Sequence, residues 1–190
     1  MTRRSVQVRP LSVEIIEEIW QQVLNIEDQI IAQQFAIEFE LITNPVCPMP
    51  YLKTLLSACR KQKILMGLIS NAQFYTPLLF NWFFNSKIVD LGFDPGLLFY
   101  SFEHQVAKPS PALFEMAADK LDAREIEPVA VLYVGNDMLN DIYPAHSIGF
   151  QTALFAGDRR SLRLRTDDPC CADLKPDLVV TDLKQLIQYI

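Results

Sequence analysis

The feature that most constrains the fold is an apolar run that ends in an acidic loop. Residues Val129 to Val134 form a continuous apolar segment rich in β-branched residues, which is typical of a parallel strand covered on both faces. Gly135 then predicts a turn, and four polar residues follow it closely: Asn136, Asp137, Asn140 and Asp141. Because open α/β sheets bind ligands at the carboxyl ends of their strands, this segment predicts an α/β fold with a ligand site at that edge.

The acidic loop has two interpretations when it is taken alone. Its closely spaced oxygen ligands suit a hard cation such as Mg²⁺, which prefers carboxylates, water and substrate phosphate. Alternatively, Asp137 or Asn140 caps the next helix by accepting hydrogen bonds from backbone N–H groups. This segment by itself leaves both interpretations open.

Composition bounds the class of protein. The chain has 190 residues, half of them hydrophobic, which is enough for one good core. A net charge of −6 argues against a nucleic-acid-binding surface. No apolar run approaches the ~20 residues of a membrane span, and the Arg3-Arg4 pair is not followed by the apolar region of a signal peptide. We therefore expect a cytoplasmic globular protein that binds neither nucleic acid nor membrane.

The first part of the chain predicts helices. Ser12 is a candidate N-cap, and apolar residues then recur at helical spacing in two successive stripes: Val13, Ile16, Trp20 and Val23, then Ile31, Phe35 and Phe39. Three prolines within six residues, 45–50, interrupt this pattern and predict a rigid connector. We interpret residues 1–45 as a partial helical cap and residues 46–190 as an α/β core.

Strand and helix patterns alternate after the connector. Thr76-Pro77 and Ser110-Pro111 predict helix starts, because proline favours the first turn of a helix, and a further helix is expected from about Asn140. Strands are predicted at 64–69, 98–102, 129–134, 152–155 and 178–180. Repeated units of this kind predict a parallel sheet with helices on both faces.

Two further polar groups lie near the carboxyl ends of predicted strands. Ser70 and Asn71 follow the strand at 64–69, where a hydroxyl and an amide could bind a phosphoryl oxygen; a plain turn is the alternative. Lys108 precedes the helix that begins near Pro111, and a positive charge there would strengthen an anion site. Its alternative is an ordinary solvated lysine.

In this order and spacing, the three polar groups resemble the haloacid dehalogenase-like (HAD) hydrolase superfamily, particularly its phosphoglycolate-phosphatase-like branch with a helical cap. The resemblance extends from about Met49 to the end of the chain. The segment Ile64-Leu-Met-Gly-Leu-Ile-Ser-Asn71, the Lys108-Pro109 pair and the segment Val134-Gly-Asn-Asp-Met-Leu-Asn-Asp-Ile142 are similar to the second, third and fourth family motifs. The resemblance implies a HAD-like Rossmannoid core with a partial α-helical cap.

The resemblance also implies roles for single residues. Ser70 and Asn71 would bind the phosphoryl group, and Lys108 would bind it and offset its charge during catalysis. Asn136, Asp137 and Asp141 would hold Mg²⁺. The family usually has aspartate where this chain has Asn136, so weakened magnesium binding is expected.

A larger departure from the family concerns its nucleophile. Family chemistry begins with an Asp-x-Asp pair after the central strand, and this chain has no aspartate before Asp28, which lies in a helical pattern. No residue is assigned as nucleophile, and the central strand is expected to be missing. Either the flanking strands pair directly, or the slot is filled by residues 5–8 or by another chain.

The predicted function follows with its alternatives. By resemblance the chain is a magnesium-dependent phosphatase of small phosphorylated metabolites, truncated and without turnover on its own. The alternative is a non-catalytic module that docks a partner or a second copy as a homodimer. A haloacid dehalogenase proper is disfavoured, because the Lys108-Pro109 and Gly135-Asn-Asp137 segments fit the phosphatase branch better.

Overall fold

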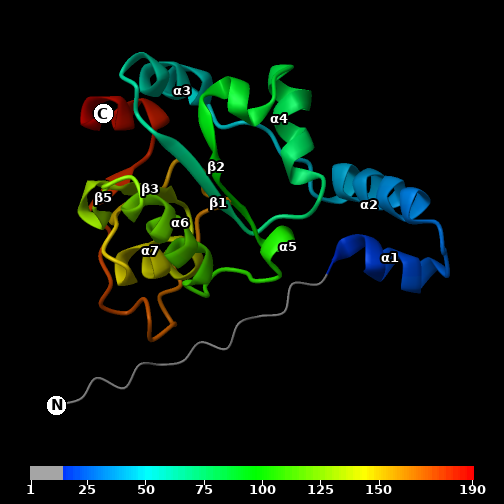
Figure 1. The fold of residues 1–190 in the computed structure, drawn as a ribbon. Helices are drawn as coiled ribbons and strands as arrows, with labels where there is room; N and C mark the ends of the chain where they lie inside the picture. The colour runs from blue at the N-terminus through cyan, green and yellow to red at the C-terminus, as the bar shows by residue number, and fades with distance from the viewer. Residues whose placement is uncertain (1–14) are drawn as a thin grey trace.

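The computed structural model describes residues 15–190 (Figure 1); the predicted strand at 5–8 and the predicted helix start at Ser12 lie outside this range. The helices are α1 (Ile16–Leu24), α2 (Gln29–Thr43), α3 (Leu52–Lys61), α4 (Thr76–Phe84), α5 (Ser101–His104), α6 (Ala112–Asp122) and α7 (Tyr143–Ser147). The strands are β1 (Met66–Ser70), β2 (Phe93–Tyr100), β3 (Leu132–Gly135), β4 (Gln151–Phe155) and β5 (Leu178–Val180). Short helical turns are η1 (Ile88–Leu91), η2 (Pro128–Ala130), η3 (Met138–Ile142) and η4 (Leu183–Tyr189).

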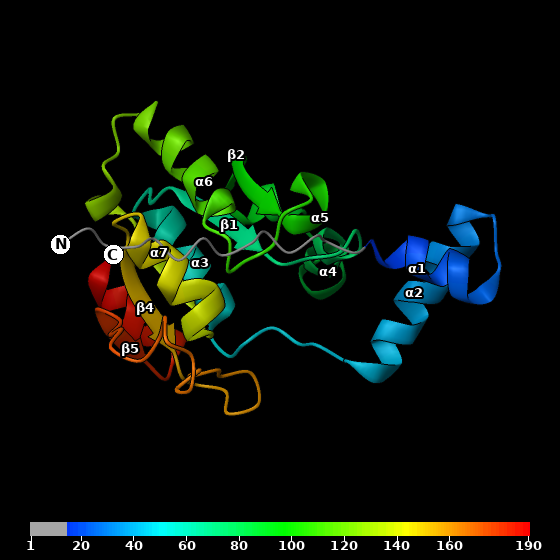
Figure 2. The same cartoon turned by 90° about the horizontal axis from the view of Figure 1, so that it is seen from below.

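The helices α1 and α2 form a pair beside the rest of the chain, joined to it by the proline-containing connector (Figure 2). The side chain of Asp28 caps α2 by accepting hydrogen bonds from the backbone N–H groups of its first turn. Trp20 packs against Phe35 and Phe39, with ring centroids 4.6 and 4.9 Å apart. These three aromatic residues of the predicted stripes therefore pack within the helix pair, whereas Val23 and Ile31 are more than half exposed. No helix among residues 15–190 is long and apolar enough to cross a membrane.

The parallel strands form two separate sheets. One contains β1 and β2, and the other has the order β3-β4-β5. Within residues 15–190, β1 and β3 are therefore both edge strands that do not pair with each other. Of the alternatives for the missing central strand, direct pairing of the flanking strands does not occur among these residues. Instead, side chains that lie near the carboxyl ends of β1 and β3 bridge the two sheets, as described below.

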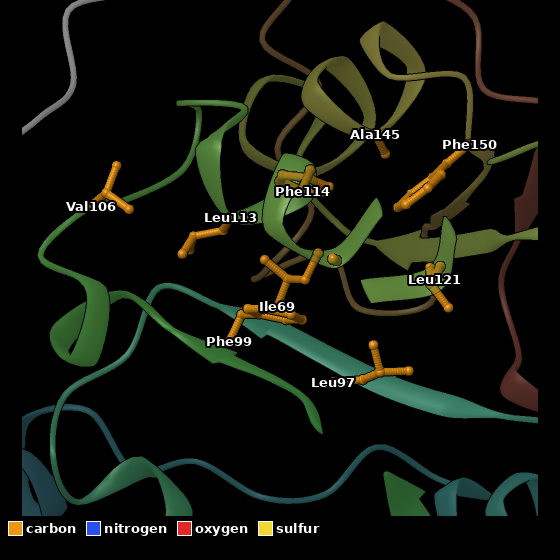
Figure 3. Packing of buried hydrophobic residues seen from close by; sticks show 10 residues of the cluster. Ile69, Leu97, Phe99, Val106, Leu113, Phe114, Leu121, Ala145 and Phe150 are labelled. Carbon is orange, nitrogen blue, oxygen red and sulfur yellow. The ribbon is translucent and has the colours of Figure 1, made fainter. Parts of the chain in front are cut away.

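Helices cover both faces of the strands, as the sequence predicted. Leu113 and Phe114 of α6 are fully buried against Ile69 and Phe99 of the first sheet and against Ala145 of α7 (Figure 3). On the other face, α3 and η4 pack against the second sheet, where Leu52 of α3 and Leu186 of η4 share a cluster with Val180 of β5. The α6 cluster joins both halves of the core, because it contacts β3 through Tyr133 as well.

The apolar run at 129–134 is only partly a strand. Val129 is 58% exposed and lies in the turn η2, and β3 begins at Leu132. Proline at position 128 fixes its own φ and lacks an N–H donor, so it starts a tight turn that is closed by the bond from the N–H of Val131 to the carbonyl of Pro128, 3.0 Å. The prediction that this whole run is a buried strand is therefore wrong at its amino end.

The buried ring of Phe114 should be essential to the core. Because Phe114 is 0% exposed, Phe114→Ala removes its contacts and leaves a cavity, with an expected loss of about 3–5 kcal/mol in the free energy of unfolding. Urea denaturation followed by circular dichroism measures this. The control is Lys120→Ala, an exposed position on the same helix, which should change stability by less than about 0.5 kcal/mol. Equal stability of the two variants would contradict the described packing.

Candidate functional site

A buried lysine lies where the two sheets meet. The Nζ atom of Lys108 lies 2.5 Å from Asp141 Oδ1, 3.2 Å from the hydroxyl of Tyr133 and 3.4 Å from the carbonyl oxygen of Ile69. The side chains of Lys108 and Asp141 are 10% and 7% exposed. An ammonium group has three donors, and these three acceptors come from β1, β3 and η3. The prediction of an ordinary solvated lysine is therefore excluded.

Backbone contacts fix the position of Lys108. The side-chain amide of Asn71 donates to the carbonyl of Lys108 (3.0 Å) and accepts from its N–H (2.8 Å). The Lys108–Pro109 peptide bond is cis. Next to Asn71, the buried hydroxyl of Ser101 bonds both the N–H and the carbonyl of Ala72, at 2.9 and 3.0 Å. The loop after β1 and the segment before α6 are thus tied together.

Tyr133 bridges the two sheets. Its hydroxyl lies 3.3 Å from the carbonyl of Ile69 on β1 and 3.2 Å from Asp141 Oδ1. Burial, together with the neighbouring carboxylate of Asp141, raises the pKa of Tyr133 well above its ordinary value. The phenol therefore stays protonated and acts as a hydrogen-bond donor at neutral pH. It therefore links β3 to the carbonyl of Ile69 on β1 and to the carboxylate of Asp141.

Asp141 is held against the backbone of its own loop. Its Oδ2 accepts hydrogen bonds from the N–H groups of Asn136 and Asp137, both at 3.0 Å. The Asp141 side chain lies so close to Gly135 that a Cβ at that position would overlap it. Glycine is therefore required at the end of β3, because only a residue without a side chain permits this close approach.

Asp137 caps the turn that follows it and pairs with an arginine. Its Oδ1 accepts from the N–H groups of Leu139 (2.9 Å) and Asn140 (3.2 Å), so the capping interpretation holds for this residue. Arg165 binds it in a fork, with Nε 3.2 Å from Oδ1 and Nη2 2.7 Å from Oδ2. Burial would raise the pKa of Asp137, but Arg165 and the two backbone N–H groups outweigh it and hold the pKa below its ordinary value.

The loop that carries Arg165 is attached to the acidic loop. The N–H of Met138 donates to the carbonyl of Arg163, and the N–H of Arg163 donates to the carbonyl of Asn136, both at 2.9 Å. Asn136 Nδ2 also donates to the carbonyl of Ser161, 2.6 Å away. These bonds place Arg165 over Asp137.

The predicted magnesium ligands can be tested against this geometry. Each of the four carboxylate oxygens of Asp137 and Asp141 already lies within hydrogen-bonding distance of at least two donors, which occupy most of the roughly four lone-pair sites of each carboxylate. Among residues 15–190, no cluster of three or more His, Cys, Asp or Glu side chains is arranged to hold a metal. The residues as placed do not fit Mg²⁺.

A pocket of about 1010 Å³ opens beside this polar centre. Its floor includes Asn71, Lys108, Asn140 and Arg165, so the polar centre faces into it. Part of its lining comes from α2 and α4, through the following side chains: Ile37, Glu40, Leu41, Leu79 and Trp82. The pocket is therefore lined both by two cations, Lys108 and Arg165, and by apolar side chains of α2 and α4.

Most of the predicted site residues come together. Asn71, Lys108, Asp137 and Asp141 form one connected network, whereas Ser70 lies beside the pocket, where its hydroxyl reaches the carbonyl of Asn71 at 3.4 Å. The role of Ser70 in phosphoryl binding stays a prediction. Sequence reasoning missed two members, Tyr133 and Arg165. Tyr133 could have been found from the sequence, because its hydroxyl is the one polar side-chain group within the apolar run 129–134. Arg165 lies in no recognisable motif.

Comparisons with known proteins agree with this architecture. A family model described as HAD-hydrolase-like matches residues 105–186, and no curated protein matches the chain. Among solved structures, a HAD phosphatase from Thermococcus onnurineus is 17% identical, with a TM-score of 0.63, over 90% of this chain and 69% of that one.

Two other solved structures share the fold. A 2-haloacid dehalogenase from Pseudomonas syringae is 22% identical with a TM-score of 0.57, over 92% of this chain and 70% of that one. The HAD-hydrolase YfnB from Bacillus subtilis, solved with bound magnesium, is 14% identical with a TM-score of 0.60 over the same shares. At these identities the structures establish the fold alone.

Removing the buried cation should destabilise the protein. Lys108→Met leaves Asp141 buried without its ion-pair partner, which should lower the free energy of unfolding by about 3–5 kcal/mol. The double variant Lys108→Met/Asp141→Asn removes both charges and should recover much of this loss. Urea denaturation at pH 7 measures both. If Lys108→Met were as stable as the double variant, the described ion pair would be contradicted.

Proposed function

Since the chain has the fold of the HAD-like hydrolase superfamily and matches its family model over residues 105–186, we propose that it binds a phosphoric monoester and descends from a phosphatase. The observation that carries this proposal is the meeting of β1, Lys108 and the acidic loop at one end of a pocket of about 1010 Å³. A buried cation with polar neighbours at the carboxyl edge of parallel strands suits an anionic group.

The phosphoryl group would lie against Lys108. Of the three contacts of its Nζ atom, the one to the carbonyl of Ile69 is the longest, at 3.4 Å, and a phosphoryl oxygen would replace it. Asn71 would act as a positioning residue, because its amide is engaged with the backbone of Lys108. The hydroxyl of Ser70 would turn from the carbonyl of Asn71 to the phosphoryl oxygen.

The organic part of the ligand would lie under α2. The wall there is largely apolar, with Ile37 and Leu41 from α2 and Leu79 and Trp82 from α4. Glu40 adds one carboxylate from α2. Such a wall favours a small phosphorylated metabolite with an apolar portion over a highly anionic one.

The covalent step of this family lacks its nucleophile here. Asp137 and Asp141 are both held in ion pairs, and neither occupies the position of the family's nucleophile. We therefore expect the 190-residue chain to bind a phosphate ester without hydrolysing it. We expect binding without magnesium, although magnesium dependence is common in the family, because the predicted metal ligands Asp137 and Asp141 are already bonded to Arg165 and Lys108.

Binding and turnover of p-nitrophenyl phosphate test the proposal separately. Calorimetry should show saturable binding by the native chain and at least about tenfold weaker binding by Lys108→Met/Asp141→Asn, since a charged hydrogen bond is lost. Release of nitrophenolate should not exceed that of buffer. The control Lys120→Met, on the surface of α6, should bind normally. Undetectable binding by the native chain would refute the proposal, and measurable hydrolysis would refute the expected inactivity.

A second candidate is a non-catalytic interaction module. It is favoured by the edges of β1 and β3, which have no strand partner on one side among residues 15–190, because unpaired strand edges readily accept another strand. In this view an extended segment of a partner or of a second copy pairs with these edges.

Mass and hydrogen exchange distinguish this candidate from a phosphate binder. If a second copy fills the gap, light scattering should give a dimer, and the backbone amides of β1 and β3 should exchange slowly and lose protection on dilution. A monomer whose β1 amides exchange rapidly at every concentration would rule out a self-docking module.

A further inference from the structure

We propose that Arg165 takes the place of a divalent metal ion in this site, so that the chain binds a phosphoryl anion without a metal. The inference rests on the proposed function, because it concerns the same anion site. The family commonly binds magnesium with carboxylates at this position, but here Asp137 and Asp141 are bonded to other groups of the protein.

The two carboxylates are already neutralised by the chain itself. Asp141 pairs with Lys108 at 2.5 Å and Asp137 pairs with Arg165 at 2.7 Å. For Mg²⁺ to bind one oxygen of each carboxylate at 2.0–2.1 Å, it would have to displace a nitrogen of Arg165 from Asp137, and either Lys108 or two backbone N–H groups from Asp141. Each of these displacements removes a charged or backbone hydrogen bond from a buried carboxylate, which disfavours a magnesium site here.

Arg165 has donors to offer an anion. Its guanidinium has five N–H groups in a fixed fork, and two of its nitrogens, Nε and Nη2, face Asp137. The side chain is 40% exposed and lines the pocket with Lys108. Its other N–H groups can therefore bind phosphoryl oxygens, a geometry for which arginine is well suited.

The backbone around Arg165 is held in an unusual conformation. Arg165 has φ of +54°, in the left-handed region, which costs an L-residue other than glycine free energy. The bonds between Arg163 and the acidic loop stabilise this turn. These bonds hold the mostly polar loop around Arg165 in a conformation in which its guanidinium contacts Asp137.

The charges also balance without a metal. Lys108 and Arg165 carry two positive charges, and Asp137 and Asp141 carry two negative ones. A bound phosphoryl group would then be stabilised by the same two cations, which remain in contact with their carboxylates.

Binding of inorganic phosphate to the full 190-residue chain tests the inference. Calorimetry in excess EDTA and in excess MgCl₂ should give the same dissociation constant within about a factor of two, well below the tenfold change that 1.4 kcal/mol would produce. Titration with Mg²⁺ alone should give no saturable heat. Arg165→Gln should weaken phosphate binding by at least about tenfold in EDTA, and Arg165→Lys, which keeps the charge but not the fork, should fall between.

A matched control is available on the same loop. Arg160→Gln makes the same change at a side chain that is 88% exposed and contacts Asp158 at 3.7 Å. It should leave phosphate affinity unchanged. Thermal unfolding of each variant shows whether it is folded at the temperature of the titration.

The outcomes separate this inference from the proposed function. Phosphate binding that requires Mg²⁺ would overturn the inference and retain the function. Equal affinity of Arg165→Gln and Arg160→Gln in EDTA would also overturn it, since the guanidinium would then play no part. Absence of phosphate binding in both buffers would overturn the proposed function and the inference together.

Discussion

The ion pair between Lys108 and Asp141 is the contact on which the carboxyl edge of this fold depends. Within residues 15–190 the parallel strands form two sheets, and at this edge Lys108 and Tyr133 bind the carbonyl of Ile69 on β1 while both contact Asp141. At this edge, hydrogen bonds from side chains therefore link the two sheets, whereas within each sheet the strands are linked by backbone hydrogen bonds. A buried ion pair is stabilising only when its remaining donors and acceptors are satisfied, and here each has a partner.

The same network explains why a HAD-like fold need not contain the family's usual metal site. Gly135 lets Asp141 pack against the backbone, where its second oxygen is occupied by two N–H groups. Asp137 is occupied by its capping bonds and by Arg165. The acidic loop keeps the residue types of a cation site, but its cations come from the chain's own side chains. The proposed phosphoryl site and its independence of metal both follow from this substitution.

Much of the architecture could be predicted because it rests on local chemistry. Apolar runs predicted a strand at or near each of β1 to β5, and the Thr76-Pro77 and Ser110-Pro111 pairs marked the starts of α4 and α6. The strand predicted at 98–102 begins five residues earlier, at Phe93, and its last two residues belong to α5. The start of β3 was predicted too early, since the turn fixed by Pro128 leaves Val129 exposed. The division of the strands into two sheets was not foreseen, because pairing between strands distant in sequence depends on which edges meet in space.

By itself, the sequence determined the order of strands and helices and the membership of Asn71, Lys108, Asp137 and Asp141 in one site, since strand ends in a parallel sheet share an edge. Only the tertiary structure decided what that site can hold. Arg165 lies 28 residues beyond Asp137 in a loop without any motif, and it reaches the carboxylate through long-range backbone bonds. The residue types in the sequence indicate which side chains could bind a metal. Whether a carboxylate oxygen still has a free lone pair for the metal depends on the hydrogen-bond donors that surround it in the folded chain.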